Sequence, residues 1–203
     1  SLEAILMQYF NPIFLKDILN VSKPQRAKAW NKMASQVIPI YILALVFTIM
    51  MSKELISILA DPKFHDSYIY AMVGASTEFF RVISNLLNNV SQSEYKTQYT
   101  IMPFAIGFLL TLFTLTIFDF RDNFIMVPFV LSFSYFFVCI LMYVQMKKLL
   151  DLKSKVHILK VLALSIPFGL IFLLPVSSSI FHSLIYLGFF GLYFLFSVWI
   201  VVK

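Results

Sequence analysis

The sequence predicts an all-α fold, a polytopic bundle of transmembrane helices, from three observations. Hydrophobic residues make up 60% of the 203 residues and charged residues 13%, and the mean hydropathy is +0.86. Soluble domains carry about 25% charged residues. Apolar runs of about 20 residues, the length that crosses a bilayer, recur along the chain. The charged residues gather in the short breaks between these runs, so we expect a multi-pass protein of a cell (inner or plasma) membrane.

Six runs are long enough to span a bilayer, and a shorter segment with a wet side, Leu2–Leu19, precedes them. The six predicted spans are Ala34–Leu59, Ser67–Ser91, Thr97–Phe118, Phe124–Met146, Val156–Val176 and Ile180–Val202. Four runs contain prolines, which membrane helices tolerate as kinks or as packing positions: Pro39, Pro103, Pro128 and Pro167. Residues 1–203 are therefore predicted to form one transmembrane domain.

The loop charges predict the orientation of these spans. Of the 16 lysine and arginine residues, twelve fall in residues 12–33, 92–97 and 147–160 and at the C-terminus. Three fall in the alternate breaks, and Arg81 lies inside a run. The positive-inside rule places the twelve in the cytoplasm, so we expect a cytoplasmic C-terminus and outward-facing breaks between.

The breaks between runs offer no room for a soluble catalytic domain, and they contain no glycine-rich phosphate loop. We therefore expect a protein that is not an enzyme and does not hydrolyse ATP. Cys139 is a lone cysteine and the three histidines show no ligand spacing, so neither a metal nor a cofactor is expected. The net charge of +6 comes from loops of the kind that face anionic lipid, and it does not indicate nucleic acid.

One segment, Ser67–Gln92, carries polar side chains along a single helical face. At about 100° per residue they fall within an arc of about 100°, and they are Glu78, Arg81, Asn85, Asn88, Asn89 and Gln92. The opposite arc is apolar. An ionisable residue near the bilayer midplane costs about 2.5–3.5 kcal/mol, so it usually faces a bundle interior or a watery cavity. We predict that these six residues bind the substrate.

Two interpretations of this polar stripe stay open. Glu78 and Arg81 are spaced i, i+3 and can neutralise each other against a neighbouring helix. Alternatively, they line a central cavity and contact an anionic or sugar-bearing substrate, or a coupling proton or cation. We favour the cavity because the amides continue the stripe to its cytoplasmic end, and paired donors and acceptors suit sugar hydroxyls.

Other polar side chains are candidates for the same cavity. Tyr70 extends the stripe outward. Gln8, Asn11 and Lys16 lie on the short first segment, for which a solvated segment end is the alternative.

Several local patterns resemble a known transporter family. The stretch from Gln8 to Pro12 and Lys16 precedes a basic break and an apolar helix that ends in Ser52–Leu59. A short outer break, Asp61–Phe64, follows, and then Tyr68; the break with Gln92, Lys96 and Thr97 also fits. Over residues 1–120 the chain resembles the Wzx-type, lipid-linked oligosaccharide (polysaccharide) flippases of the multidrug/oligosaccharidyl-lipid/polysaccharide superfamily, which is MATE-like.

This resemblance implies an all-helical transporter of 12–14 spans, in two pseudo-symmetric lobes around a central cavity. The cargo would be a glycan on undecaprenyl pyrophosphate, such as an O-antigen unit of lipopolysaccharide, flipped by alternating access. Membrane lipids, a coupling proton or cation and polysaccharide assembly proteins would be its partners. We expect the chain to be a fragment, most of the C-terminal lobe. Flippase cavities are often rich in arginine and lysine, whereas here Arg81 alone is clearly intramembrane.

Three other functions are alternatives to flipping of lipid-linked glycans. A cation- or proton-coupled small-molecule (multidrug) exporter of the same fold would use Glu78 for coupling. A membrane-embedded glycan ligase or acyltransferase would need reactive residues at the outer face, usually on a long loop, and the outer breaks here are short. A structural assembly subunit would leave the midplane charges unexplained. Export of lipid-linked glycans is the predicted function.

Overall fold

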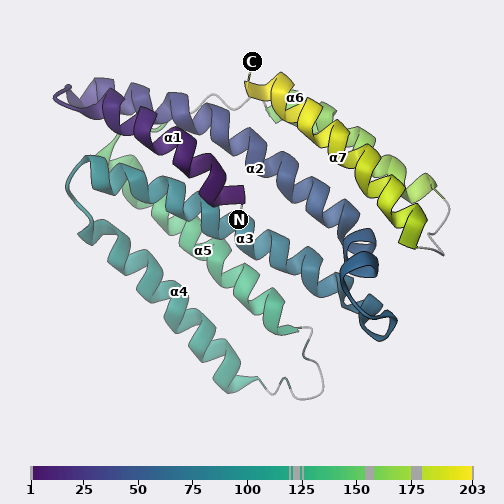
Figure 1. Cartoon of the computed structure of the whole chain (residues 1–203). Coiled ribbons are helices and arrows are strands. Elements are labelled where there is room, and N and C mark those ends of the chain that lie inside the picture. Colours follow the sequence, from purple (N-terminus) through teal and green to yellow (C-terminus); the bar gives the residue numbers. More distant parts are fainter. Residues whose placement is uncertain are drawn as a thin grey trace. The chain divides into compact units, whose positions relative to one another are not determined.

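The computed structural model describes residues 2–118, 120, 124, 126–153, 158–174 and 180–202. Every element in this described part is a helix, and no strand occurs in it, so the all-α prediction is confirmed (Figure 1). In chain order the elements are α1 (Leu2–Ile18), α2 (Lys23–Leu59), η1 (Pro62–Ser67), α3 (Tyr68–Ser93), α4 (Gln98–Ile117), α5 (Met126–Leu149), α6 (Ile158–Ser165), η2 (Ile166–Leu173) and α7 (Ile180–Val202).

Four of these helices, α2, α4, α5 and α7, are long and apolar enough to cross a membrane. Large apolar side chains stand exposed on them, for example Phe108 on α4 and Leu192 on α7. Water would make such a surface costly, whereas lipid tails cover it without cost. The chain is therefore a membrane-embedded helical protein.

Two of the six predicted spans differ from these four helices. Helix α3 forms, but its amides lower its hydropathy and it is not among the four candidate spans. In the predicted span Val156–Val176, α6 passes at Ser165 into the 3-10 helix η2, with Pro167 in its first turn. Proline lacks the N–H that an α-helix needs, which favours a change of helix type at this point. Both ends of this predicted span lie outside the described residues.

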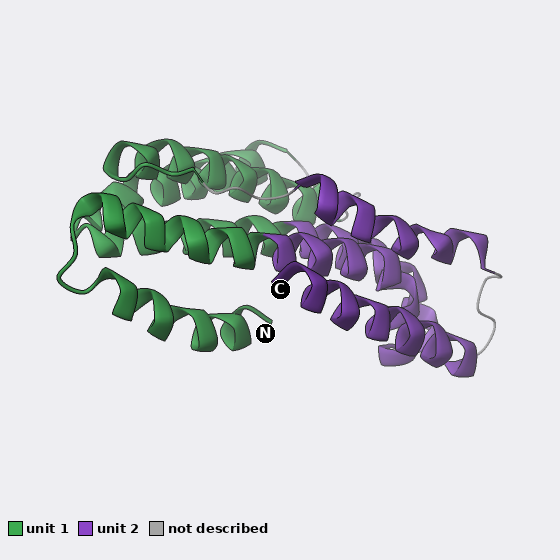
Figure 2. Ribbon diagram, turned by 90° about the horizontal axis from the view of Figure 1, so that it is seen from above, with its two compact units in different colours: residues 1–38, 77–156 green, residues 39–76, 157–203 purple. Residues whose placement is uncertain are grey.

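The chain divides into two compact units (Figure 2). Unit 1 holds residues 1–38 and 77–156, and unit 2 holds residues 39–76 and 157–203. Helices α2 and α3 each contribute one part to either unit.

In unit 1, α3 and α5 pack against the first part of α2. The buried Trp30 indole donates a hydrogen bond to the Leu86 carbonyl of α3 at 3.2 Å. Asn31 holds the segment after α5, bonding the Asp151 carbonyl at 2.9 Å and the Lys153 amide at 2.8 Å. Helix α4 lies along α5 (Figure 1).

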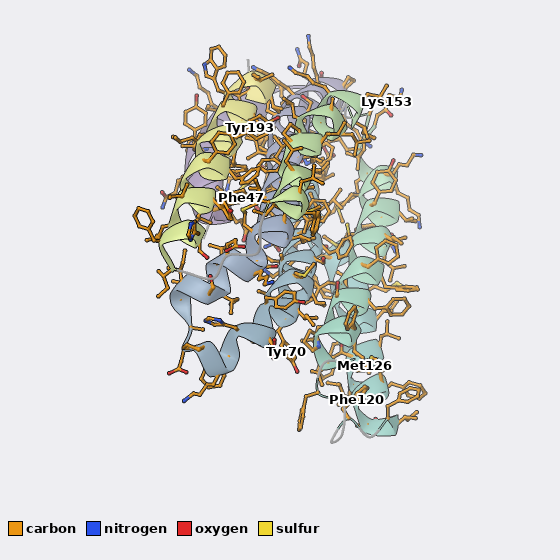
Figure 3. The ribbon with its side chains drawn as sticks, turned by 90° about the vertical axis from the view of Figure 1, so that its right-hand side faces the viewer. Phe47, Tyr70, Phe120, Met126, Lys153 and Tyr193 are labelled. Carbon is orange, nitrogen blue, oxygen red and sulfur yellow. The ribbon has the colours of Figure 1, made fainter. Side chains whose placement is uncertain are left out.

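Unit 2 is built around an aromatic core. Phe168 of η2 and Phe190 of α7 are fully buried. Phe47 stacks on Phe194, with ring centroids 5.2 Å apart, and meets Phe168 edge-on at 5.9 Å. Tyr193, labelled with Phe47 in Figure 3, adds a hydrogen bond from its hydroxyl to a carbonyl of α6. Apolar packing therefore holds this unit together.

Candidate functional site

Helix α3 has the two opposite faces that its sequence predicts. Val82, Leu86 and Val90 are almost completely buried within the structure. On the other face Glu78 and Gln92 are exposed, and the polar residues between them are partly buried. The apolar face packs, which leaves the polar stripe directed away from that packing.

Arg81 lies in the middle of the stripe and holds two carboxylates. Its Nε donates to one Glu78 oxygen at 2.7 Å, and Nη2 donates to the other oxygen, a two-pronged pairing across one helical turn. Nη2 also donates to a Glu3 oxygen of α1 at 2.7 Å. The arginine thus links α3 to α1.

Two amides extend this link along both helices. Asn85 donates to the second Glu3 oxygen at 2.8 Å, and Asn89 donates to the Asn11 oxygen of α1 at 3.5 Å. Figure 1 shows α1 beside this part of α3. We call this row of contacts the polar seam, formed by Glu3, Asn11, Glu78, Arg81, Asn85 and Asn89.

The polar seam carries more negative than positive charge. Its two carboxylates face one guanidinium, which leaves a net charge of −1 when all three groups are ionised. A guanidinium has five N–H donors, and these bonds use Nε and Nη2. The two N–H groups of Nη1 have no hydrogen-bond partner among the described residues. An acceptor oxygen can therefore reach Arg81 without displacing Glu3 or Glu78.

A cavity of about 420 Å³ lies at one end of the polar seam, where α1 and α3 approach the start of α2. Its polar walls include Asn11, Asn89 and Gln92, and its apolar walls include Phe14 and Ile18. At its edge, Arg26 pairs with Glu94 at 2.8 Å. The cavity combines amide donors and acceptors with an apolar wall, a combination that suits a sugar face and its hydroxyls.

The structure brings some of the predicted site residues together and leaves others apart. The Asn88 side chain accepts a hydrogen bond from Ser91 at 2.8 Å within α3, and it forms no hydrogen bond with α1 among the described residues. Gln8 and Lys16 are exposed and do not line this cavity. Tyr70 is exposed and belongs to unit 2 (Figure 3).

Sequence reasoning missed Glu3, Arg26 and Glu94. Glu3 lies eight residues before Asn11 on the same helix, and an acidic group in that apolar segment was a usable signal. Arg26 and Glu94 are 68 residues apart, so nothing in the local pattern indicates that they pair.

Within the described residues, no three histidine, cysteine, aspartate or glutamate side chains gather into a group that could hold a metal ion. No model of a known family, no curated protein and no solved structure matches the chain. The fold and the apolar helices define the class, a helical membrane protein. Membership of the flippase family stays a prediction from sequence.

Proposed function

We propose that the chain is part of a transporter that exports lipid-linked oligosaccharides across a cell membrane for surface polysaccharide synthesis. The polar seam and its adjoining cavity carry this proposal. Charged and amide side chains are costly in an apolar helix, and where they occur in membrane proteins they mark substrate or ion pathways. A glycan headgroup needs such groups to cross the apolar layer.

The polar seam and the adjoining cavity have separate roles in this proposal. The amides Asn89 and Gln92 bind sugar hydroxyls in the cavity. Arg81 receives a pyrophosphate oxygen or an acidic sugar through Nη1, because guanidinium geometry matches such anions. The lipid tails stay in the bilayer beside the exposed apolar faces.

The net charge of the polar seam makes coupling to protons part of the proposal. With both carboxylates ionised, the seam repels an anionic headgroup. Protonation of Glu78, the more exposed of the two with 49% of its side chain accessible, would leave Glu3 and Arg81 balanced. The Nη1 of Arg81 can then bind the anion without a net negative charge beside it, and release of the proton favours release of the cargo.

Complementation in a cell that depends on this protein for surface polysaccharide tests the proposal. Arg81→Ala should abolish export while the amount of protein in the membrane is unchanged. Lys153→Ala is the matched control, since Lys153 is an exposed cation outside the polar seam. Normal export by Arg81→Ala would exclude the proposed role of Arg81.

A cation- or proton-coupled exporter of small molecules is the second candidate. The net negative charge of the polar seam favours it, because a cationic substrate would bind there directly. Dye efflux that depends on Glu78 and on pH, with surface polysaccharide unaffected, would select this function over glycan export.

A further inference from the structure

Unit 2 contains a second carboxylate network that the polar seam does not involve. Glu54 lies on α2, and it is 7% exposed, the one buried carboxylate residue among those that the structure describes. A buried ionised carboxylate is costly unless a counter-charge or several hydrogen bonds compensate it. No described lysine or arginine pairs with Glu54 within 4.0 Å.

Two serine hydroxyls form a hydrogen-bonded network with Glu54. Ser183 of α7 lies 2.6 Å from Glu54 Oε2, and Ser57, one turn further along α2, lies 3.0 Å from Ser183 Oγ. Ser57 Oγ is also 2.8 Å from the Glu54 carbonyl oxygen. The three contacts form a closed ring that joins α2 to α7.

The number of protons in this ring indicates its protonation state. Each contact needs one donated proton, and each serine hydroxyl has one proton to donate. Two hydroxyls therefore satisfy two of the three contacts while Glu54 is ionised. A proton on Glu54 completes the ring: Glu54 donates to Ser183, Ser183 to Ser57, and Ser57 to the Glu54 carbonyl. We propose that Glu54 is a proton-binding site.

A cavity of about 350 Å³ gives this site a route for the proton. Glu54, Ser57 and Ser183 line it together with exposed residues, so a proton can pass between bulk water and the carboxyl. The other titratable groups on its wall are Lys53, His65, Asp66 and Tyr68. The Nε2 of His65 is buried without a hydrogen-bond partner among the described residues.

The same wall argues for a proton rather than a metal cation. Lys53 and a histidine stand beside Glu54 and Asp66, so negative charge does not accumulate as a metal site requires. In the proposed reaction the Glu54 carboxylate takes up one proton and becomes a carboxylic acid, and no other reactant is needed. Proton release puts a charge back into the ring and removes one donor, which weakens the contact between α2 and α7.

Infrared difference spectroscopy of the purified protein in lipid bilayers tests this inference without a transport assay. The spectrum between alkaline and acidic buffer should contain a C=O band of a buried carboxylic acid, and Glu54→Gln should remove it. Glu94→Gln is the matched control. Its carboxylate is similarly enclosed, with 10% of the side chain exposed, but Arg26 holds it as an ion pair. The control should retain the band.

Ser183→Ala keeps the carboxyl and removes its hydroxyl partner, so the band should shift in frequency. An unchanged band in Glu54→Gln, or an unshifted band in Ser183→Ala, would overturn the proposal; the second result does so even if Glu54→Gln does not fold. The inference does not depend on the glycan proposal. The infrared band reports Glu54 in unit 2, whereas export by Arg81→Ala tests the polar seam in unit 1, so either proposal can fail while the other stands.

Discussion

The two units accommodate carboxylates in apolar helices by different means. In unit 1, Arg81 forms ion pairs with Glu3 and Glu78, and the groups remain partly accessible. In unit 2, Glu54 is buried and its described partner is a hydroxyl, Ser183. A counter-ion keeps a carboxylate charged near water, whereas hydroxyls in a buried site suit a group that binds a proton. The comparison separates an ion-paired, partly accessible site from a buried site whose described partner is a hydroxyl.

The same contrast extends to packing. Unit 2 is packed around a core of aromatic rings, while the α1–α3 contact of unit 1 includes polar pairs. Within a membrane, lipid tails are as apolar as the core, so close packing rather than the hydrophobic effect stabilises such contacts. Removal of a ring from unit 2 should therefore cost more than removal of a charge from the polar seam.

Phe168→Ala tests the core of unit 2 and should have the largest effect. It leaves a cavity of about 100 Å³, which at about 24 cal/mol per Å³ lowers the free energy of unfolding by about 2 kcal/mol. Denaturation by SDS in mixed micelles measures this change. Phe172→Ala is the control on the same helix η2, since Phe172 is 75% exposed and its removal leaves no cavity. Equal losses in both variants would contradict the core described here.

Gly107→Ala tests the α4–α5 contact of unit 1. A Cβ at Gly107 would overlap the Val138 side chain, so we expect a net loss of about 1–2 kcal/mol after the gain in helix propensity. Adding Val138→Ala should restore most of the stability. Gly191→Ala is the control, because nothing lies within 4 Å of a Cβ there. If Val138→Ala did not restore the stability of Gly107→Ala, the loss would not come from overlap with the Val138 side chain.

Much of the fold could be predicted from sequence because length and hydropathy determine membrane helices. The polar face of α3 followed from the 3.6-residue period. The change from α6 to η2 was less predictable, since prolines such as Pro39 and Pro103 lie within continuous α-helices whereas Pro167 follows the end of one. Neighbouring helices decide which proline interrupts a helix.

The partners of the stripe could not be predicted in the same way. Glu3 contacts Arg81 and Asn85 across about 80 residues, and the sequence pattern of one helix does not say how a neighbour is rotated. The role of Glu54 could not be predicted either, because its hydrogen-bonded ring needs Ser183, 129 residues further along the chain. Spacing predicts which face is polar, and packing determines which residues meet on it.

Glu3→Gln tests whether the polar seam holds α1 to α3 and should have the smallest effect of the three. Glutamine keeps the shape but replaces charge-assisted hydrogen bonds with neutral ones, so we expect a loss of about 0.5–1 kcal/mol in the SDS titration. Glu78→Gln is the matched control. Its pair with Arg81 lies one turn away on the same helix and is half exposed, so about 0.5 kcal/mol or less should be lost. If Glu78→Gln lost more stability than Glu3→Gln, the charge of Glu3 would contribute little to the α1–α3 contact. Helix α1 would then be held mainly by apolar side chains such as Phe10 and Phe14.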